Sequence, residues 1–243
     1  TVSEPDMRSA EEARQYLVKL RAILQYLGVS TGNMEDGSFR CDANISIRPV
    51  GSSQLFTKVE VKNMNSLRAV YRALQYEEER QIRVVEEGGR IVQETRGWVE
   101  ERGVTVSQRT KEEAHDYRYF PEPDLPPLSI DPRWVEEVRA NLPELPEARR
   151  QRFVAQYGLP IYDASLLTAS RPTADFFEAC LTARETAPPE MSARSKTIAN
   201  WMLGDLAGLL NASGTELEES RVTPERLREF TDLIDAGTIS GTA

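Results

Sequence analysis

The sequence predicts an α+β fold, with a mixed or antiparallel sheet in its first half and helices alone in its second half. Residues 40–48 and 58–63 alternate apolar and polar side chains, which is typical of strands with one buried face. From residue 131 onward, the spacing of apolar residues is almost wholly helical. Between these regions, four prolines in residues 121–127 exclude a helix and indicate an extended crossing. We therefore predict two domains, an α+β cradle-like domain and a helical domain, over residues 1–130 and 131–243.

The first half contains further elements on either side of the alternating strands. An amphipathic helix is predicted over residues 9–27, because Ser9 begins a capping-box pattern and Gly28 supplies a stop. Residues 90–98 and 103–107 read as two more strands, joined as a hairpin. The first half is therefore expected to combine helices with a small sheet.

A long helix is predicted directly after the second alternating strand. Its N-cap is Asn65 or Ser66, and it runs to about Glu87. The strand that carries Glu60 and Lys62 thus leads into a helix N-terminus, whose unpaired N–H groups favour phosphate. A plain capped turn is the simpler interpretation. The apolar positions expected to face the core are Leu67, Val70, Leu74, Ile82 and Val85.

The second half is predicted to consist of successive helices separated by Pro and Gly signals. Proline at the first helical position supports several of these starts. The longest predicted helix covers residues 192–210. The expected helix starts are Pro132, Pro146, Tyr162, Thr173, Ser192 and Pro224.

Composition narrows the class of protein. The chain has 243 residues and a net charge of −9, so its overall charge does not indicate a nucleic-acid-binding protein, although a local basic patch is compatible with it. Cys41 and Cys180 are the only cysteines, which fits a reduced, cytoplasmic location without a disulfide framework. No segment predicts a membrane span or a signal peptide. The chain opens on Thr1 rather than Met, and we expect an N-terminal portion to be missing.

One face of the predicted strand pair collects polar side chains. Alternation places Asp42 and Asn44 on the same side of the first strand, and Glu60 and Lys62 on one side of the second. A solvated sheet face is the simpler explanation. However, Asp and Asn are depleted in strands, which favours a functional reason for their presence. Carboxylates such as these suit Mg²⁺, which takes oxygen ligands and bridges phosphates.

Other chemical motifs are absent from the sequence or weak. There is no Walker-type loop, no dinucleotide fingerprint and no zinc-ligand spacing. His115 is the only histidine, and a lone histidine beside Asp116 is more typical of a structural hydrogen-bonding pair than of a catalytic one.

Longer stretches resemble a known family. They match the signature segments of the GatB family, the B subunits of aspartyl/glutamyl-tRNA amidotransferases, over nearly the whole chain. The matching segments are SEPD at 3–6, GSFRCDANIS at 37–46, VEVKNMNS at 59–66, QETR at 93–96, DYRYFPEPD at 116–124, NLPELP at 141–146, LPIYDA at 159–164 and AGTIS at 236–240.

The resemblance implies a fold and an activity. The family has an α+β cradle, a helical domain and a small tail, and this chain would supply the second part of the cradle and the helical domain. The implied reaction phosphorylates the side-chain carboxylate of Glu on tRNA(Gln), or of Asp on tRNA(Asn), with ATP and Mg²⁺, and then amidates it with ammonia. The implied partners are an amidase (glutaminase) subunit, a small third subunit, the mischarged tRNA and, as a further candidate, the aminoacyl-tRNA synthetase.

The resemblance also implies roles for residues on the polar strand pair. Glu60, Lys62 and Asp42 would be catalytic, and Glu4 and Glu60 would hold the metal, although the family draws its metal ligands largely from the earlier part of the cradle. The residues expected to bind the cofactor are Asn44, Asn63, Asn65, Ser66 and Arg68.

Two other functions remain open from the residues. The first is a non-catalytic tRNA-binding adaptor, and the second is a free-standing small-molecule kinase or ligase. The adaptor would use basic residues of the helical half as phosphate contacts, although ordinary helix surface charge also explains them. These residues are Arg149, Arg150, Arg152, Arg171, Arg184, Arg194 and Lys196.

Overall fold

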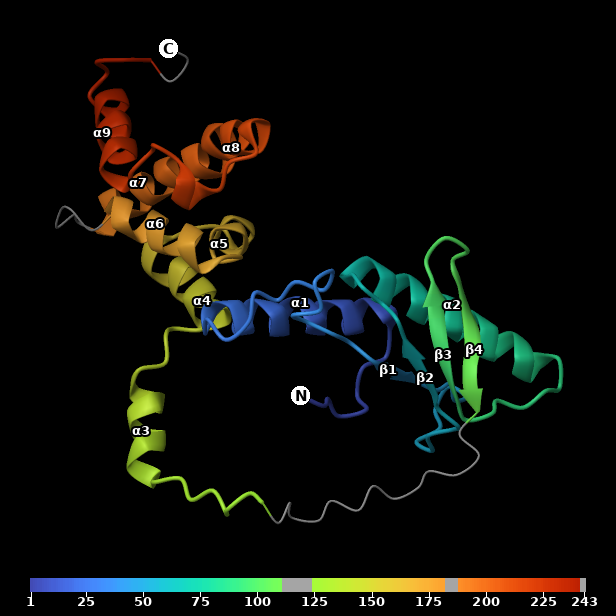
Figure 1. The fold of residues 1–243 in the computed structure, drawn as a ribbon. Helices are drawn as coiled ribbons and strands as arrows, with labels where there is room; N and C mark the ends of the chain where they lie inside the picture. Colours follow the sequence, from blue (N-terminus) through green and yellow to red (C-terminus); the bar gives the residue numbers. More distant parts are fainter. Residues whose placement is uncertain (111–123, 182–187, 241–243) are drawn as a thin grey trace. The chain divides into compact units, whose positions relative to one another are not determined.

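The computed structural model describes residues 1–110, 124–181 and 188–240, and it confirms the α+β fold. The chain divides into two compact units, which we describe separately (Figure 1). Unit 1 comprises residues Thr1–Leu24 and Ser30–Asn141, and unit 2 comprises Gln25–Val29 and Leu142–Ala243. The predicted domain boundary after residue 130 stays a prediction. His115 and Asp116 lie outside the described residues.

Unit 1 contains a four-stranded mixed sheet in the order β1-β2-β3-β4. Strand β1 pairs antiparallel with β2, β2 pairs parallel with β3, and β3 pairs antiparallel with β4. The predicted pairing of the two alternating segments is therefore confirmed, although β1 is shorter than the predicted strand. The bounds are β1 Ala43–Ile45, β2 Val59–Lys62, β3 Glu94–Val99 and β4 Val104–Thr110.

Two helices accompany this sheet. Helix α1 covers Ala10–Tyr26, and α2 covers Leu67–Glu86 with Ser66 as its N-cap. Helix α2 lies along one face of the sheet, where buried apolar side chains of the helix and the strands form the core of unit 1 (Figure 1). The most buried members of this core include Val59, Val61, Val70, Ala73 and Trp98.

The predicted core positions near the end of α2 are wrong. Ile82 and Val85 are 40% and 46% exposed. The buried positions in this part of the helix are Glu77 and Gln81, both fully buried. Helical periodicity could not identify them, because a buried polar residue is stable only where partners exist elsewhere in the fold.

Unit 1 also includes α3, Pro132–Ala140, which begins at Pro132 as the sequence predicts and is capped by Asp131. Unit 2 is built from helices around a core that includes Phe153, Phe177 and Ile198. The predicted helix over residues 192–210 is present but contains a π-helical turn at Met202–Leu206. The helices are α4 Pro146–Tyr157, α5 Ile161–Leu167, α6 Arg171–Leu181, α7 Pro188–Trp201, α8 Ala207–Ser213 and α9 Pro224–Asp235, with a 3₁₀ turn at Leu217–Glu219.

Within the described ranges, no helix combines the length and apolarity that crossing a bilayer requires.

Candidate functional site

The two faces of the sheet in unit 1 differ in character. Val59 and Val61 of β2 are buried on the face that α2 covers. Because successive side chains of a strand alternate, Glu60 and Lys62 lie on the opposite face. The strand register places Asn44 of β1 directly opposite Glu60. We call this opposite surface the polar face, and it is defined by Asp42, Asn44, Glu60, Lys62 and Thr95.

The three predicted catalytic residues lie together on the polar face. The Lys62 Nζ atom lies 3.1 Å from Asp42 Oδ2 and 3.6 Å from Glu60 Oε1. The pKa of Lys62 is raised, chiefly because its ammonium donates a hydrogen bond to Asp42 and also lies near Glu60. The lysine therefore stays positively charged between two carboxylates. Its side chain is 41% exposed, so a ligand could reach it from solvent.

Sequence reasoning missed the residue that contacts Glu60 from the neighbouring strand. Thr95 of β3 is only 4% exposed, and its hydroxyl donates a 2.8 Å hydrogen bond to Glu60 Oε2. Glu60 and Thr95 are register partners in the parallel pair β2–β3. The QETR segment contains this threonine, but residue spacing alone does not predict which strand lies beside β2.

The turn from β2 to α2 holds the predicted cofactor-binding residues. Asn63 has a φ of +64°, and it is the one non-glycine residue with a positive φ in the described part of the chain. Its Nδ2 atom donates to the Trp98 carbonyl at 3.1 Å, which ties this turn to β3. Ser66 caps α2 by accepting a hydrogen bond from the amide of Ala69. Asn65 is exposed, as is Arg68.

The chain that carries this arrangement matches a known protein family. Residues 1–136 match the family model described as the GatB/GatE catalytic domain, and residues 175–243 match the GatB domain. The chain belongs to the GatB family. Every residue of the polar face lies within the part matched by the GatB/GatE catalytic domain.

Individual relatives agree with the family models. The chain is 56% identical to the B subunit of the aspartyl/glutamyl-tRNA(Asn/Gln) amidotransferase of Carboxydothermus hydrogenoformans, over 99% of this chain and 48% of that protein. It is 57% identical to the B subunit of Dehalococcoides mccartyi strain 195, over 98% of this chain and 49% of that protein. It is 55% identical to the B subunit of Moorella thermoacetica, over 99% of this chain and 49% of that protein. The chain thus spans about half the length of the curated relatives it matches.

The carboxylates of this GatB chain are suited to a Mg²⁺ ion only in part. Asp42 and Glu60 offer oxygen ligands on one face, beside the same lysine. Mg²⁺ commonly binds through one or two carboxylates, with waters and substrate phosphates completing its shell. Among the residues described, no group of three or more metal-ligating side chains is present. Glu4 is exposed ahead of α1, and its predicted pairing with Glu60 at a metal stays a prediction.

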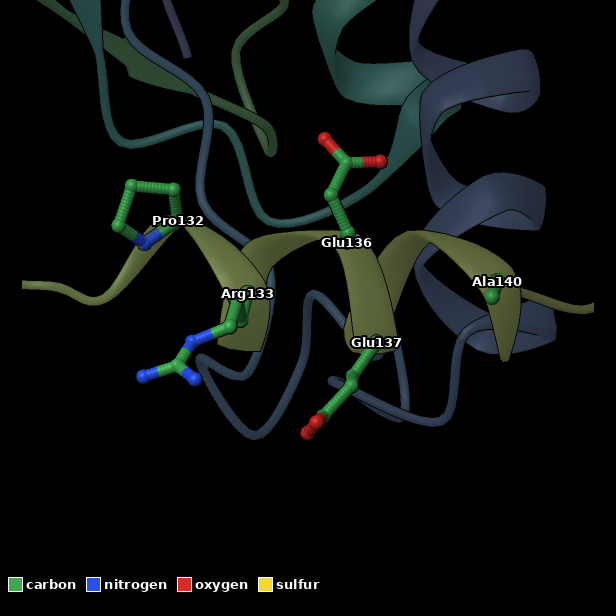
Figure 2. A pocket seen from close by; sticks show the side chains of 5 residues that line it. All are labelled: Pro132, Arg133, Glu136, Glu137 and Ala140. Atoms are coloured by element: carbon green, nitrogen blue, oxygen red, sulfur yellow. The ribbon is translucent and has the colours of Figure 1, made fainter.

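A surface hollow of about 520 Å³ lies on α3, and none of the residues that line it belongs to the polar face (Figure 2). All five residues that line it belong to α3, with Arg133 and Glu136 among them. Each is exposed. Because one helix supplies the whole lining, a ligand there would remain largely in solvent.

The basic residues that the adaptor hypothesis would use as phosphate contacts form ion pairs within unit 2, wherever the structure describes them. Glu178 accepts from Arg149 at 2.5 Å and from Arg152 at 2.6 Å, and the hydroxyl of Tyr157 also donates to it. Burial raises the pKa of Glu178, but these hydrogen bonds outweigh it and lower the pKa from 4.5 to about 2. The other pairs are Arg150–Glu147, Arg171–Asp175, Arg194–Asp232 and Lys196–Asp163, and Arg184 lies outside the described residues.

Proposed function

We propose that this chain is part of an ATP-dependent tRNA amidotransferase subunit. Its substrate is Glu esterified to tRNA(Gln) or Asp esterified to tRNA(Asn), and its cofactors are ATP and Mg²⁺. The observation that carries this proposal is the Asp42–Lys62–Glu60 group on the polar face, in the part of the chain that matches the GatB/GatE catalytic domain. The relatives are named as B subunits of the aspartyl/glutamyl-tRNA amidotransferase, which supports the same assignment.

The proposed reaction has two steps. A carboxylate oxygen of the esterified amino acid attacks the γ-phosphorus of ATP, and the bond to the leaving ADP breaks. Ammonia then attacks the acyl carbon, a C–N bond forms, the bond to phosphate breaks, and the nitrogen loses a proton. Phosphoryl transfer depends on positioning and charge neutralisation more than on covalent help from the protein.

The residues of the polar face suit the first step. Lys62 carries a positive charge at a partly exposed position, where it can bind the phosphate oxygens. Asp42 and Glu60 would hold Mg²⁺, which neutralises phosphate charge when bound. Asn44 lies opposite Glu60 and can donate or accept hydrogen bonds beside it. The backbone at Asn63 and the start of α2 follow this group directly along the chain.

The second step of the proposed reaction, amidation by ammonia, indicates which protein partners the chain would need. Because that step consumes ammonia, we propose that an amidase (glutaminase) subunit releases ammonia from glutamine and that a small third subunit joins the two. The mischarged tRNA is the substrate, and the aminoacyl-tRNA synthetase is a further proposed partner. The internal ion pairs of unit 2 weaken the alternative of a pure adaptor, because its proposed phosphate contacts already have acidic partners.

The test is ATP consumption by the assembled amidotransferase with and without mischarged tRNA. We expect ATP hydrolysis to require Glu-tRNA(Gln) or Asp-tRNA(Asn). Hydrolysis that is independent of tRNA would instead identify a small-molecule kinase. An absence of ATP consumption under both conditions would identify a non-catalytic adaptor.

A further inference from the structure

We infer that Thr95 is a positioning residue for the Glu60 carboxylate. The inference rests on the proposed function, because it assigns Thr95 a part in the same site. Thr95 itself contacts no reacting atom in this account. It acts by fixing which Glu60 oxygen is turned toward Lys62.

The hydrogen bonds distinguish the two oxygens of Glu60. The Thr95 hydroxyl donates to Oε2 at 2.8 Å, while Oε1 lies 3.6 Å from the Lys62 ammonium. Without such a bond, the carboxylate of a glutamate can rotate about χ3, because this terminal torsion angle has a broad range of allowed values. The neutral hydroxyl restrains this rotation without neutralising the charge.

The threonine is itself held firmly. It is 4% exposed, and its β-branched side chain has restricted rotation about χ1. It sits where the β3–β4 register shifts between Thr95 and Arg96, a β-bulge irregularity. Bulges of this kind redirect side chains and are common beside active sites. The parallel register with Glu60 sets the height of the hydroxyl along the strand.

A second buried threonine in the same sheet provides a matched comparison. Thr105 of β4 is 3% exposed, and its hydroxyl donates to Glu77 at 2.8 Å. This contact lies on the face that α2 covers. The two threonines therefore share burial and the length of the bond to their glutamate. They differ in the face of the sheet on which that glutamate lies, and the Thr105 hydroxyl also accepts a hydrogen bond from Arg96 Nε at 2.8 Å.

The test compares Thr95→Val, Thr95→Ser and Thr105→Val in the assembled amidotransferase. Valine keeps the shape of threonine but removes the hydroxyl, and serine keeps the hydroxyl. We expect T95V to lower kcat for tRNA amidation about tenfold with the KM for tRNA unchanged, because a misplaced group loses rate rather than binding. We expect T95S to retain most of the activity. T105V should lower the melting temperature and leave kcat unchanged.

Several results would overturn the inference. A T95V enzyme with wild-type kcat contradicts it, and so does equal loss in T95V and T95S, which would indicate lost packing instead. If T95V does not fold, the comparison of Thr95→Ala with T95S replaces it, with the same expected difference in kcat. Glu60→Gln separates this inference from the proposed function. An active E60Q enzyme removes the proposed site, whereas an inactive E60Q beside a fully active T95V contradicts the Thr95 role alone.

Discussion

Each face of the sheet has a glutamate that accepts a hydrogen bond from a threonine, but the surrounding charged groups are buried on one face and partly exposed on the other. On the face covered by α2, Glu77 is fully buried and accepts hydrogen bonds from Thr105 and Arg80. On the polar face, Glu60 accepts from Thr95, while its neighbours Lys62 and Asp42 remain 41% and 55% exposed. A buried, hydrogen-bonded group of charges specifies structure, and a similar group open to solvent can bind a ligand.

This contrast explains why residue types alone do not locate a site. Arg96 on the covered face contacts Glu94 at 2.7 Å and Glu77 at 3.5 Å, so its charge has internal partners in a closed environment. Lys62 also has internal partners, but it keeps a solvent-exposed surface. Solvent exposure therefore separates the two networks.

The largest expected effect is on stability, from Glu77→Gln. This change removes one charge from a fully buried network and leaves the guanidinium of Arg80 without its closest partner. Breaking a buried ion pair costs about 3 to 5 kcal/mol. We expect this loss in the free energy of unfolding, measured by hydrogen exchange of α2 amides. A loss below about 1 kcal/mol, as is usual for exposed pairs, would contradict the distinction between the faces.

Next in size is the effect of Lys62→Met on catalysis. Removing a charge that stabilises the transition state costs about 100-fold in rate. Because Lys62 is partly exposed, we expect the stability to change by less than about 1 kcal/mol. The measurement is the rate of tRNA amidation by the assembled enzyme. Lys19→Met, at an exposed lysine of α1, serves as the control and should keep the wild-type rate.

A smaller effect is expected in acid, from the ion-pair network of unit 2. The pKa of Glu178 lies at about 2 in the folded chain, below its ordinary 4.5. Its stabilising contribution is therefore present above pH 4.5 and lost as the pH falls toward 2. We expect Glu178→Gln to cost about 2 kcal/mol at neutral pH and to flatten this acid dependence. Hydrogen exchange of α6 amides measures the free energy of unfolding at neutral pH and its dependence on pH.

The control for that experiment is Glu147→Gln. Glu147 pairs with Arg150 on the surface of α4, with its side chain 47% exposed. An exposed pair of this type contributes roughly 0 to 1 kcal/mol. Equal acid dependence in E147Q and E178Q would show that the network around Glu178 has no special stability.

Local patterns in the sequence predicted much of this structure. The alternation around Asp42 and Glu60 predicted the β1–β2 pairing, because these strands are close in sequence and each has one apolar side. The N-cap at Ser66, one of the two expected positions, and the stop of α1 before Gly28 followed from local backbone chemistry.

What could not be predicted depends on contacts between distant segments. Thr95 lies 35 residues from Glu60, on a strand that follows α2 along the chain and pairs parallel with β2. Helical spacing predicts that Ile82 lies in the core, yet the buried residue is Gln81, whose Nε2 atom donates a hydrogen bond to Glu77. Buried polar positions of this kind can be recognised only when the fold shows which distant residues are their hydrogen-bond partners.

The central claim is that the polar face, and not the covered face, carries the chemistry. The most direct test is Glu60→Gln beside Glu77→Gln in the full amidotransferase, at a temperature where both variants are folded. Two rates are measured for each, amidation of mischarged tRNA and release of ammonia from glutamine. We predict that E60Q loses amidation by about 100-fold or more while it keeps ammonia release, and that E77Q keeps both. Normal amidation by E60Q would contradict the account.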